Sequence, residues 1–207
     1  MLALSAGGRW HNAPFSPDPA VTASWPPPLR HTPRQHGWLA HGFRAPRALR
    51  GSLSDRGSLT RRLQARHADF RVVPVARGLA QPFPDETRLL RMHSHTLAYV
   101  RDVLLIGDGQ VRVFAHSVLP RSSLRGGWNG ITRLGSRPLG EALFTNPRIR
   151  RLGLTIRRLD ARHPLYRAAQ RHTGITARKL WARRSVFCLS GRSLLVTEVF
   201  LPAIDAL

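Results

Sequence analysis

Two pairs of apolar, β-branched segments, each joined by a tight turn, constrain the fold of this chain more than any other feature. The first pair is HTLAYVRDVLLIG (95–107) and QVRVFAHSVLP (110–120), which meet at a Gly-Asp-Gly turn. The second pair is LWARRSVFCL (180–189) and SLLVTEVFLP (193–202), which flank Ser-Gly-Arg. Val, Ile, Phe and Thr favour strands, and Asp-Gly or Ser-Gly between two strands favours a tight hairpin. The sequence therefore predicts two β-hairpins in an antiparallel sheet.

Segments with weaker strand or helix character lie before and between the hairpins. Strands are predicted over 69–78 and 150–159, and helices over 138–145, 161–172 and, weakly, 38–53. A further short helix is expected to begin after Ser58, whose hydroxyl suits an N-cap. Pro74 has no N–H group and indicates a sheet edge or a bulge. Helices inserted among hairpin-linked strands predict an α+β domain built on one antiparallel sheet.

The first 36 residues differ in composition from the rest of the chain. Residues 1–36 hold seven of the sixteen prolines and show no steady apolar period, which predicts a disordered tail ahead of a domain over 37–207. No apolar run approaches the roughly 20 residues of a membrane helix, and the start lacks the pattern of a secretory signal. The lone cysteine, Cys188, excludes a disulfide framework and is expected to be a buried, inert thiol. We therefore expect a cytoplasmic protein without a membrane span.

The chain is strongly basic, with 33 Lys and Arg against 11 Asp and Glu and a formal net charge of +22. Such a charge suits a nucleic-acid partner, or a solvated basic surface that attracts small anions. No helix-turn-helix, zinc-finger or aromatic-studded motif accompanies the charge, so we favour a small anionic molecule over nucleic acid. The run ARRS (182–185) is most simply a solvated strand face, with the edge of an anion site as the alternative. His93 and His95 have no accompanying carboxylate pattern, so we expect no metal site.

Two charged residues stand out because they lie within apolar strands. Of the three glutamates, Glu86 and Glu141 are expected to be exposed, but Glu198 lies in a strand that is apolar on both faces. Arg101 has the same environment in the strand before the first hairpin turn. Burying a charge is costly unless it is paired. Two interpretations remain: an Arg–Glu pair that satisfies itself, or a polar site in an apolar cavity, where the arginine takes a carboxylate and the glutamate a hydroxyl.

Four blocks of the chain match a known family in residues and spacing. WARRSVFCLSGRSLLVTEVFLPA (181–203) resembles the C-terminal signature of the chorismate pyruvate-lyase family, which ends in a Trp-x-Arg-Arg-Ser strand, a Ser-Gly turn and a Thr-Glu strand. YVRDVLLIGDGQVRVFAHSVLP (99–120) resembles the arginine strand and hairpin of the same family. RPLGEALF (137–144) and RGSLTRRLQ (56–64) resemble its two lid segments. The resemblance covers about residues 50–207.

The resemblance implies a fold, a reaction and site residues. The fold is a six-stranded antiparallel sheet with helices on one side and helical lids over a buried site. Arg101 and the backbone amides of Leu59 and Leu139 fall on positions that bind the substrate carboxylate, and Glu198 falls on the site glutamate. Both leucines are expected at helix starts, where free N–H groups attract anions. The segment 148–178 is longer than in short family members and is expected to add a helix near the sheet edge.

The implied reaction cleaves chorismate to 4-hydroxybenzoate and pyruvate, the first committed step of ubiquinone biosynthesis, in a monomer that needs neither a metal nor a redox cofactor. Bond cleavage is either a concerted hydrogen shift from the ring to the enolpyruvyl methylene or a stepwise elimination with Glu198 as acid or base. The enolpyruvyl carboxylate needs its own cation, for which Arg183 and Arg184 are candidates.

Two other functions remain as alternatives. One is a non-catalytic small-molecule-sensing domain of the same fold, as occurs in some bacterial transcription regulators. Such regulators carry a winged helix ahead of this domain, and the first 50 residues here are too irregular for one. The other is a basic nucleic-acid-binding protein, which rests on the net charge alone.

Overall fold

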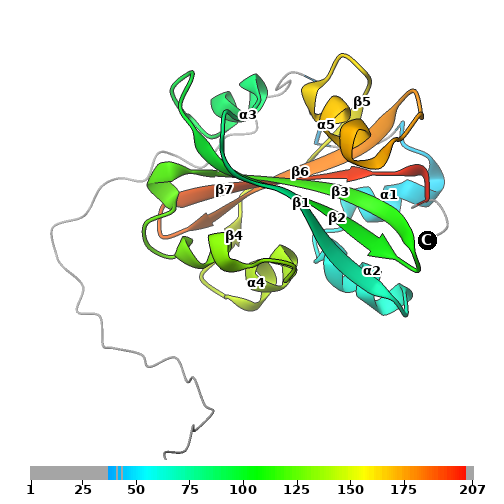
Figure 1. Ribbon diagram of the computed structural model, residues 1–207, viewed down its shortest axis with the longest axis horizontal. Coiled ribbons are helices and arrows are strands. Elements are labelled where there is room, and N and C mark those ends of the chain that lie inside the picture. The colour runs from blue at the N-terminus through cyan, green and yellow to red at the C-terminus, as the bar shows by residue number, and fades with distance from the viewer. Residues whose placement is uncertain (1–36, 41, 43, 204–207) are drawn as a thin grey trace, which may run out of the picture.

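The structure, a computed structural model, describes residues 37–40, 42 and 44–203 (Figure 1). The predicted tail over 1–36 lies outside the described residues, so the domain boundary stays a prediction. The helices are α1 (Arg47–Ser54), α2 (Leu59–Arg66), α3 (Pro84–Leu89), α4 (Leu139–Thr145) and α5 (Pro164–Thr173), with short 3-10 helices η1 (Arg121–Ser123) and η2 (Asn129–Arg133). The strands are β1 (Phe70–Ala80), β2 (Ala98–Gly107), β3 (Gln110–Pro120), β4 (Arg150–Arg151), β5 (Thr155–Leu159), β6 (Leu180–Leu189) and β7 (Arg192–Phe200).

All these strands form one antiparallel sheet, in the order β1-β2-β3-β7-β6-β4, with β5 also paired to β6. The two predicted hairpins are confirmed as β2–β3 and β6–β7. Their turns have positive φ at both central residues, 49° and 74° at Asp108 and Gly109, and 48° and 75° at Ser190 and Gly191. Positive φ at both positions is the mark of a type I′ turn, whose twist matches that of the strands it joins.

The sheet has seven strands, whereas the family resemblance implied six. The segment predicted as one strand, 150–159, is divided into β4 and β5, and both pair with β6. Arg151 lies opposite Phe187 and Thr155 lies opposite Arg184, so the divided strand holds one residue more than its partner over this stretch. An extra residue interrupts the hydrogen-bond ladder, as in a β-bulge, and here it separates the two strands.

Helices cover both faces of the sheet, rather than the one face that the resemblance implied. Helices α1, α2 and α4 lie on one face, and α3 and α5 lie on the other (Figure 1). Strand β2 shows why both faces need a cover. Its Val103 belongs to the same core as Leu53 and Leu63 of α1 and α2, whereas the next residue, Leu104, belongs to the core that holds Leu165 of α5. A strand that is apolar on both faces is stable only when both are buried.

Local signals begin the helices close to where they are predicted. Ser58 precedes α2, and its Oγ accepts a hydrogen bond from the N–H group of Arg61 at 3.3 Å. The weakly helical segment 38–53 forms a helix only from Arg47 onward, as α1. The longer segment 148–178 supplies α5, which packs against the central strands β3 and β7 as well as the sheet edge. Helix α3 has no counterpart among the predicted elements. Within the described ranges, no helix has the length and apolar character that crossing a membrane requires.

Candidate active site

A cavity lies between the sheet and the first residues of α2 and α4. About 590 Å³ of space lies among its lining residues, a volume that includes solvent on its open side. Its walls are mostly apolar, and its charged lining residues are Arg101, Arg151, Arg183 and Glu198. The four residues that the sequence singled out for the site, Leu59, Arg101, Leu139 and Glu198, all line this cavity. Chain segments more than 130 residues apart therefore meet in one place, and the mixture of apolar walls with a few charges is typical of a small-molecule site.

Arg101 of β2 is 3 % exposed and is anchored from the loop before α4. Its Nη2 donates hydrogen bonds to the backbone carbonyls of Gly135 at 2.9 Å and Arg137 at 3.2 Å. Burial lowers the pKa of Arg101 from its ordinary value. Neutral carbonyls do not balance the charge of a guanidinium, so Arg101 retains a positive charge toward the cavity. Among the described residues no hydrogen bond or ion pair joins Arg101 to Glu198, so the self-satisfied Arg101–Glu198 pair is wrong.

Glu198 of β7 pairs instead with Arg183 of β6. The Nε atom of Arg183 lies 2.5 Å from Oε2 of Glu198, and the side chain of Glu198 is 17 % exposed, more than the full burial expected. The two residues lie directly opposite each other in the β6–β7 hairpin. A two-residue turn determines which residues of the two strands face each other. The Ser-Gly turn in the sequence is therefore the signal from which this pair could be predicted.

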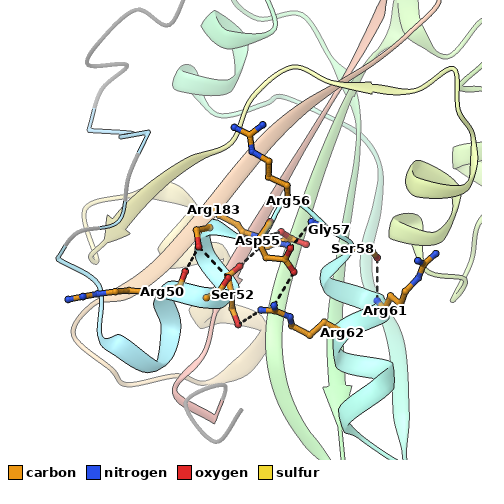
Figure 2. Close-up of polar contacts among 12 residues, drawn as sticks. Arg50, Ser52, Asp55, Arg56, Gly57, Ser58, Arg61, Arg62 and Arg183 are labelled. Atoms are coloured by element: carbon orange, nitrogen blue, oxygen red, sulfur yellow. Dashed lines mark hydrogen bonds and ion pairs between the residues drawn. The ribbon is translucent and has the colours of Figure 1, made fainter.

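Arg183 also holds the connection between α1 and α2. Its Nη1 donates hydrogen bonds to the carbonyls of Ser52 at 2.6 Å and Asp55 at 2.8 Å. Figure 2 shows the guanidinium reaching this connection, where the Asp55 carboxylate accepts from the N–H of Gly57 and pairs with Arg62. The ion pair of the cavity and the segment that leads into α2 are therefore joined through one side chain.

Arg151 of β4 is a cavity residue for which the sequence analysis has no counterpart. Its Nε donates to Oγ of Ser185 at 2.7 Å, and its Nη1 donates to the carbonyl of Arg56 at 2.7 Å. The guanidinium carbon lies 5.6 Å from the ring centre of Phe187. Burial, and then the nearby charge of Arg183, lower the pKa of Arg151 to about 10. Arg151 lies among many other arginines, so nothing in the neighbouring sequence indicates that it lines the cavity.

Arg184 lies on the opposite face of the sheet, away from the cavity. Its Nη1 donates to Oδ2 of Asp85 at 2.7 Å, and its guanidinium carbon lies 4.1 Å from the ring centre of Trp38. Arg184 is therefore no candidate for a substrate carboxylate. The expectation that ARRS is a solvated face is wrong, because Arg183 and Arg184 are 1 % and 3 % exposed. Successive residues of a strand point to opposite faces, and here both faces are covered.

Glu86 is buried, not exposed as the sequence predicted. It lies in α3, where its Oε2 accepts from the N–H of Phe83 at 3.0 Å, and its Oε1 lies 3.2 Å from Nε2 of His116. Nδ1 of His116 lies 2.6 Å from Oδ1 of Asp102. Burial favours a low pKa for His116, but the charge of Glu86 and the hydrogen bonds to both carboxylates outweigh burial and raise that pKa to about 10. Glu141 of α4 is exposed, as predicted.

The first residues of α2 and α4 face each other at the mouth of the cavity. Leu59 and Leu139 are the first helical residues, and both line the cavity. A Cβ atom added at Gly140 would lie 2.9 Å from Oγ1 of Thr60 and 3.0 Å from Oγ of Ser58, so the two helix starts approach as closely as a glycine allows. The first N–H groups of a helix have no partner within the helix and carry partial positive charge. The two starts therefore add donors to a cavity that is already positive.

The remaining candidates lie outside this cavity. Among the described residues no group of three or more His, Cys, Asp and Glu side chains could hold a metal ion. His93 and His95 are exposed in the segment before β2 and do not share a strand face. Cys188 is a free, buried thiol, as predicted.

Comparison with known proteins agrees with the resemblance. The family model described as "Chorismate lyase" matches residues 40–205. A protein of Thiobacillus denitrificans named "Probable chorismate pyruvate-lyase" is 69% identical over 170 residues, which are 82% of this chain and 91% of the relative. A protein of the same name from Aromatoleum aromaticum is 47% identical over 183 residues, 85% of this chain and 97% of the relative.

A solved structure shares the fold at low identity. PhnF from Mycobacterium smegmatis superposes with a TM-score of 0.50 and 15% identity, over 72% of this chain and 65% of that chain. Sequence identity this low supports a shared fold and not a shared function. The family match spans most of the chain and all four predicted site positions, and from it the assignment follows: this chain belongs to the chorismate lyase family.

Proposed function

We propose that this protein cleaves chorismate to 4-hydroxybenzoate and pyruvate, the first committed step of ubiquinone biosynthesis. Its family supports the reaction. The observation that carries the proposal is the cavity itself, where Arg101 and Glu198 lie apart in apolar walls beneath two helix starts. The enzyme acts on this small molecule as a cytoplasmic monomer, with α2 and α4 as the lids of the site.

The substrate lies in the cavity with its ring carboxylate toward Arg101. The N–H groups of Arg101 that are not bonded to Gly135 and Arg137 can donate to that carboxylate, and the backbone amides of Leu59 and Leu139 complete its binding. Among the described residues, the hydrogen bond from Arg183 to Glu198 uses only one carboxylate oxygen, Oε2. The other oxygen, Oε1, therefore accepts a hydrogen bond from the ring hydroxyl.

The reaction is balanced within the substrate. The bond between the ring carbon and the enolpyruvyl oxygen breaks, the hydrogen on the neighbouring hydroxyl-bearing carbon moves to the enolpyruvyl methylene, and the ring becomes aromatic. The products are 4-hydroxybenzoate and pyruvate, with no atom gained or lost. The protein's role in this concerted route is to hold the reacting groups close and to exclude water. The pairing of Glu198 with Arg183 supports this route, because Glu198 then needs only to accept a hydrogen bond with its other oxygen.

The direct test incubates the purified chain with chorismate and follows 4-hydroxybenzoate and pyruvate together. We expect both products in equal amounts. Binding of chorismate without turnover would instead favour a sensing domain of the same fold. Absence of both binding and turnover would overturn the proposal.

Arg101→Ala tests the ring-carboxylate anchor. We expect the variant to bind chorismate and 4-hydroxybenzoate roughly 10- to 100-fold more weakly, since a hydrogen-bonded charge is worth about 1.5–3 kcal/mol. Titration calorimetry with the product and steady-state kinetics with the substrate measure the two effects. Arg77→Ala is the matched control, because Arg77 lies opposite Arg101 on β1 but is exposed. Unchanged affinity in Arg101→Ala would move the anchor elsewhere.

A further inference from the structure

The charges in the cavity are not balanced. Three guanidinium groups, from Arg101, Arg151 and Arg183, face one carboxylate, from Glu198, which leaves two positive charges uncompensated within the lining. A buried charge without a partner is costly, so this cavity is suited to a ligand with two negative charges. Chorismate carries two carboxylates, on the ring and on the enolpyruvyl group.

Arg183 is already occupied. Its Nε contacts Glu198, and its Nη1 donates to the carbonyls of Ser52 and Asp55 (Figure 2). Its charge is balanced by that of Glu198, and its hydrogen bonds hold the α1–α2 connection. A second substrate carboxylate bound there would have to displace Glu198 or this connection.

Among the described residues, Arg151, like Arg101, has no carboxylate bonded to it. Its hydrogen bonds within the described part of the chain go to the Ser185 hydroxyl and the Arg56 carbonyl, and both acceptors are uncharged. These bonds use Nε and Nη1, whereas Nη2 takes part in none of the hydrogen bonds found among the described residues. Arginine has five N–H donors, so donors remain for a ligand. Burial and the nearby charge of Arg183 lower the pKa of Arg151, which agrees with a half-buried cation that has no carboxylate bonded to it.

The order of the strands places this cation at the far end of the cavity from Arg101. Arg101 of β2 faces Ser117 of β3, which faces Val196 of β7, which faces Ser185 of β6. Arg151 of β4 reaches the end of this row through its bond to Ser185. Neighbouring strands lie about 4.8 Å apart, so four steps separate the backbones at the two ends by roughly 19 Å, and both arginines line the cavity between these ends.

Glu198 lies on β7, in the middle of this arrangement. A molecule that meets Arg101 with a ring carboxylate and Glu198 with a ring hydroxyl then directs its remaining substituent toward β6 and β4. We infer that Arg151 binds the enolpyruvyl carboxylate of chorismate. This inference rests on the proposed function. Because the enolpyruvyl carboxylate leaves with pyruvate, Arg151 would contact chorismate but would have no carboxylate to bind in 4-hydroxybenzoate.

The difference between substrate and product supplies the test. Arg151→Gln and Arg151→Lys are compared with wild type in steady-state kinetics with chorismate and in titration calorimetry with 4-hydroxybenzoate. We expect Arg151→Gln to raise the KM for chorismate by roughly 10- to 100-fold and to leave the Kd for 4-hydroxybenzoate within about threefold. Arg151→Lys keeps the charge and is expected to lie between Arg151→Gln and wild type.

Arg150→Gln is the matched control, because Arg150 is the other residue of β4 and is exposed. We expect wild-type values from it, and we expect Arg101→Ala to weaken substrate and product alike. An equal loss of both ligands in Arg151→Gln would mean that Arg151 only supports the fold, through Arg56, and would overturn the inference. An unchanged KM for chorismate would also overturn it. Wild type without turnover would refute the proposed function itself, so the two failures are distinguishable.

Discussion

The carboxylate of Glu198 is shared between the protein and the proposed ligand. One oxygen contacts Nε of Arg183 at 2.5 Å, and Arg183 is itself held by two backbone carbonyls. The position of the carboxylate is therefore determined by the sheet and by the α1–α2 connection together. Such a carboxylate is suited to orient a hydroxyl, because its geometry is constrained on the side away from the ligand.

Glu198→Gln tests whether this residue orients the substrate or transfers a proton. Gln keeps the shape and loses the charge, so we expect the KM for chorismate to rise about tenfold and kcat to stay within about tenfold of wild type. Steady-state kinetics measure both values. Glu141→Gln, on the exposed face of α4, is the control. A fall in kcat of about 10²- to 10⁴-fold with unchanged KM would instead indicate general acid–base catalysis.

The starts of α2 and α4 are tied to the sheet by the same arginines that line the cavity. Arg183 and Arg151 hold the carbonyls of the segment before α2, and Arg101 holds the carbonyls of Gly135 and Arg137 before α4. Each of these two helices thus begins at a point that a cavity charge holds in place. The close approach of Gly140 to α2 then determines how far apart the two helix starts lie.

Gly140→Ala tests this spacing. The new Cβ would lie 2.9 Å from Oγ1 of Thr60 and 3.0 Å from Oγ of Ser58, which is the N-cap of α2 and cannot move without losing its bond to Arg61. We expect the helix starts to separate and the Kd for 4-hydroxybenzoate to rise about tenfold, as calorimetry would measure.

The control for this change is Gly51→Ala. Gly51 lies in α1, and an added Cβ there meets no atom within 4 Å. We expect that variant to bind like wild type and to unfold at a higher temperature, since Ala is favoured over Gly by about 0.5–1 kcal/mol in a helix. Wild-type product binding by Gly140→Ala would contradict a role for the spacing of the helix starts.

At the scale of the whole molecule, the sheet separates two buried polar groups. One face carries the cavity. The other carries His116 between Asp102 and Glu86, with the ring of Phe83 stacked at 5.1 Å between centres. This second group attaches α3 to the central strands. Part of the large positive charge of the chain is also internal, because four of the arginines that the structure describes are buried: Arg101, Arg112, Arg183 and Arg184.

The His116 group makes the stability of the protein depend on pH. The pKa of His116 is about 10 in the folded chain, above its ordinary value of 6.5. A raised folded pKa gives stability that is complete below about pH 6.5 and is lost as pH rises toward 10. We expect the free energy of unfolding to fall between pH 7 and 9 by at most about 1.4 kcal/mol per pH unit from this group.

Urea unfolding of wild type and His116→Asn at pH 7, 8 and 9 measures this dependence. We expect the pH slope to be smaller in the variant, because Asn does not titrate. The imidazole proton signals of His116 in the folded protein, followed by NMR, are expected to show the charged form at pH 8. Equal slopes in both proteins, or a neutral imidazole at pH 8, would contradict the role of this group.

Local features of the chain were sufficient to predict much of the fold and to single out Arg101 and Glu198, which both line the cavity. The strands of both hairpins, their turns and the Ser58 cap depend on residues close together in sequence. Arg101 and Glu198 stand out for the same reason, since a charge within an apolar strand is visible without its partner. The division of 150–159 and the cover on both sheet faces depend on strand register and on distant helices, and were not predicted.

The sequence by itself determined the period of each strand, the type of each turn and the presence of two unusual charges, because these follow from neighbouring residues. Only the tertiary structure decided which partner each charge takes. It pairs Glu198 with Arg183, buries Glu86 against His116, and brings Arg151 to the cavity. The physical reason is that a buried charge is stabilised by whatever lies within a few ångströms, and those neighbours come from strands and helices far apart in the chain.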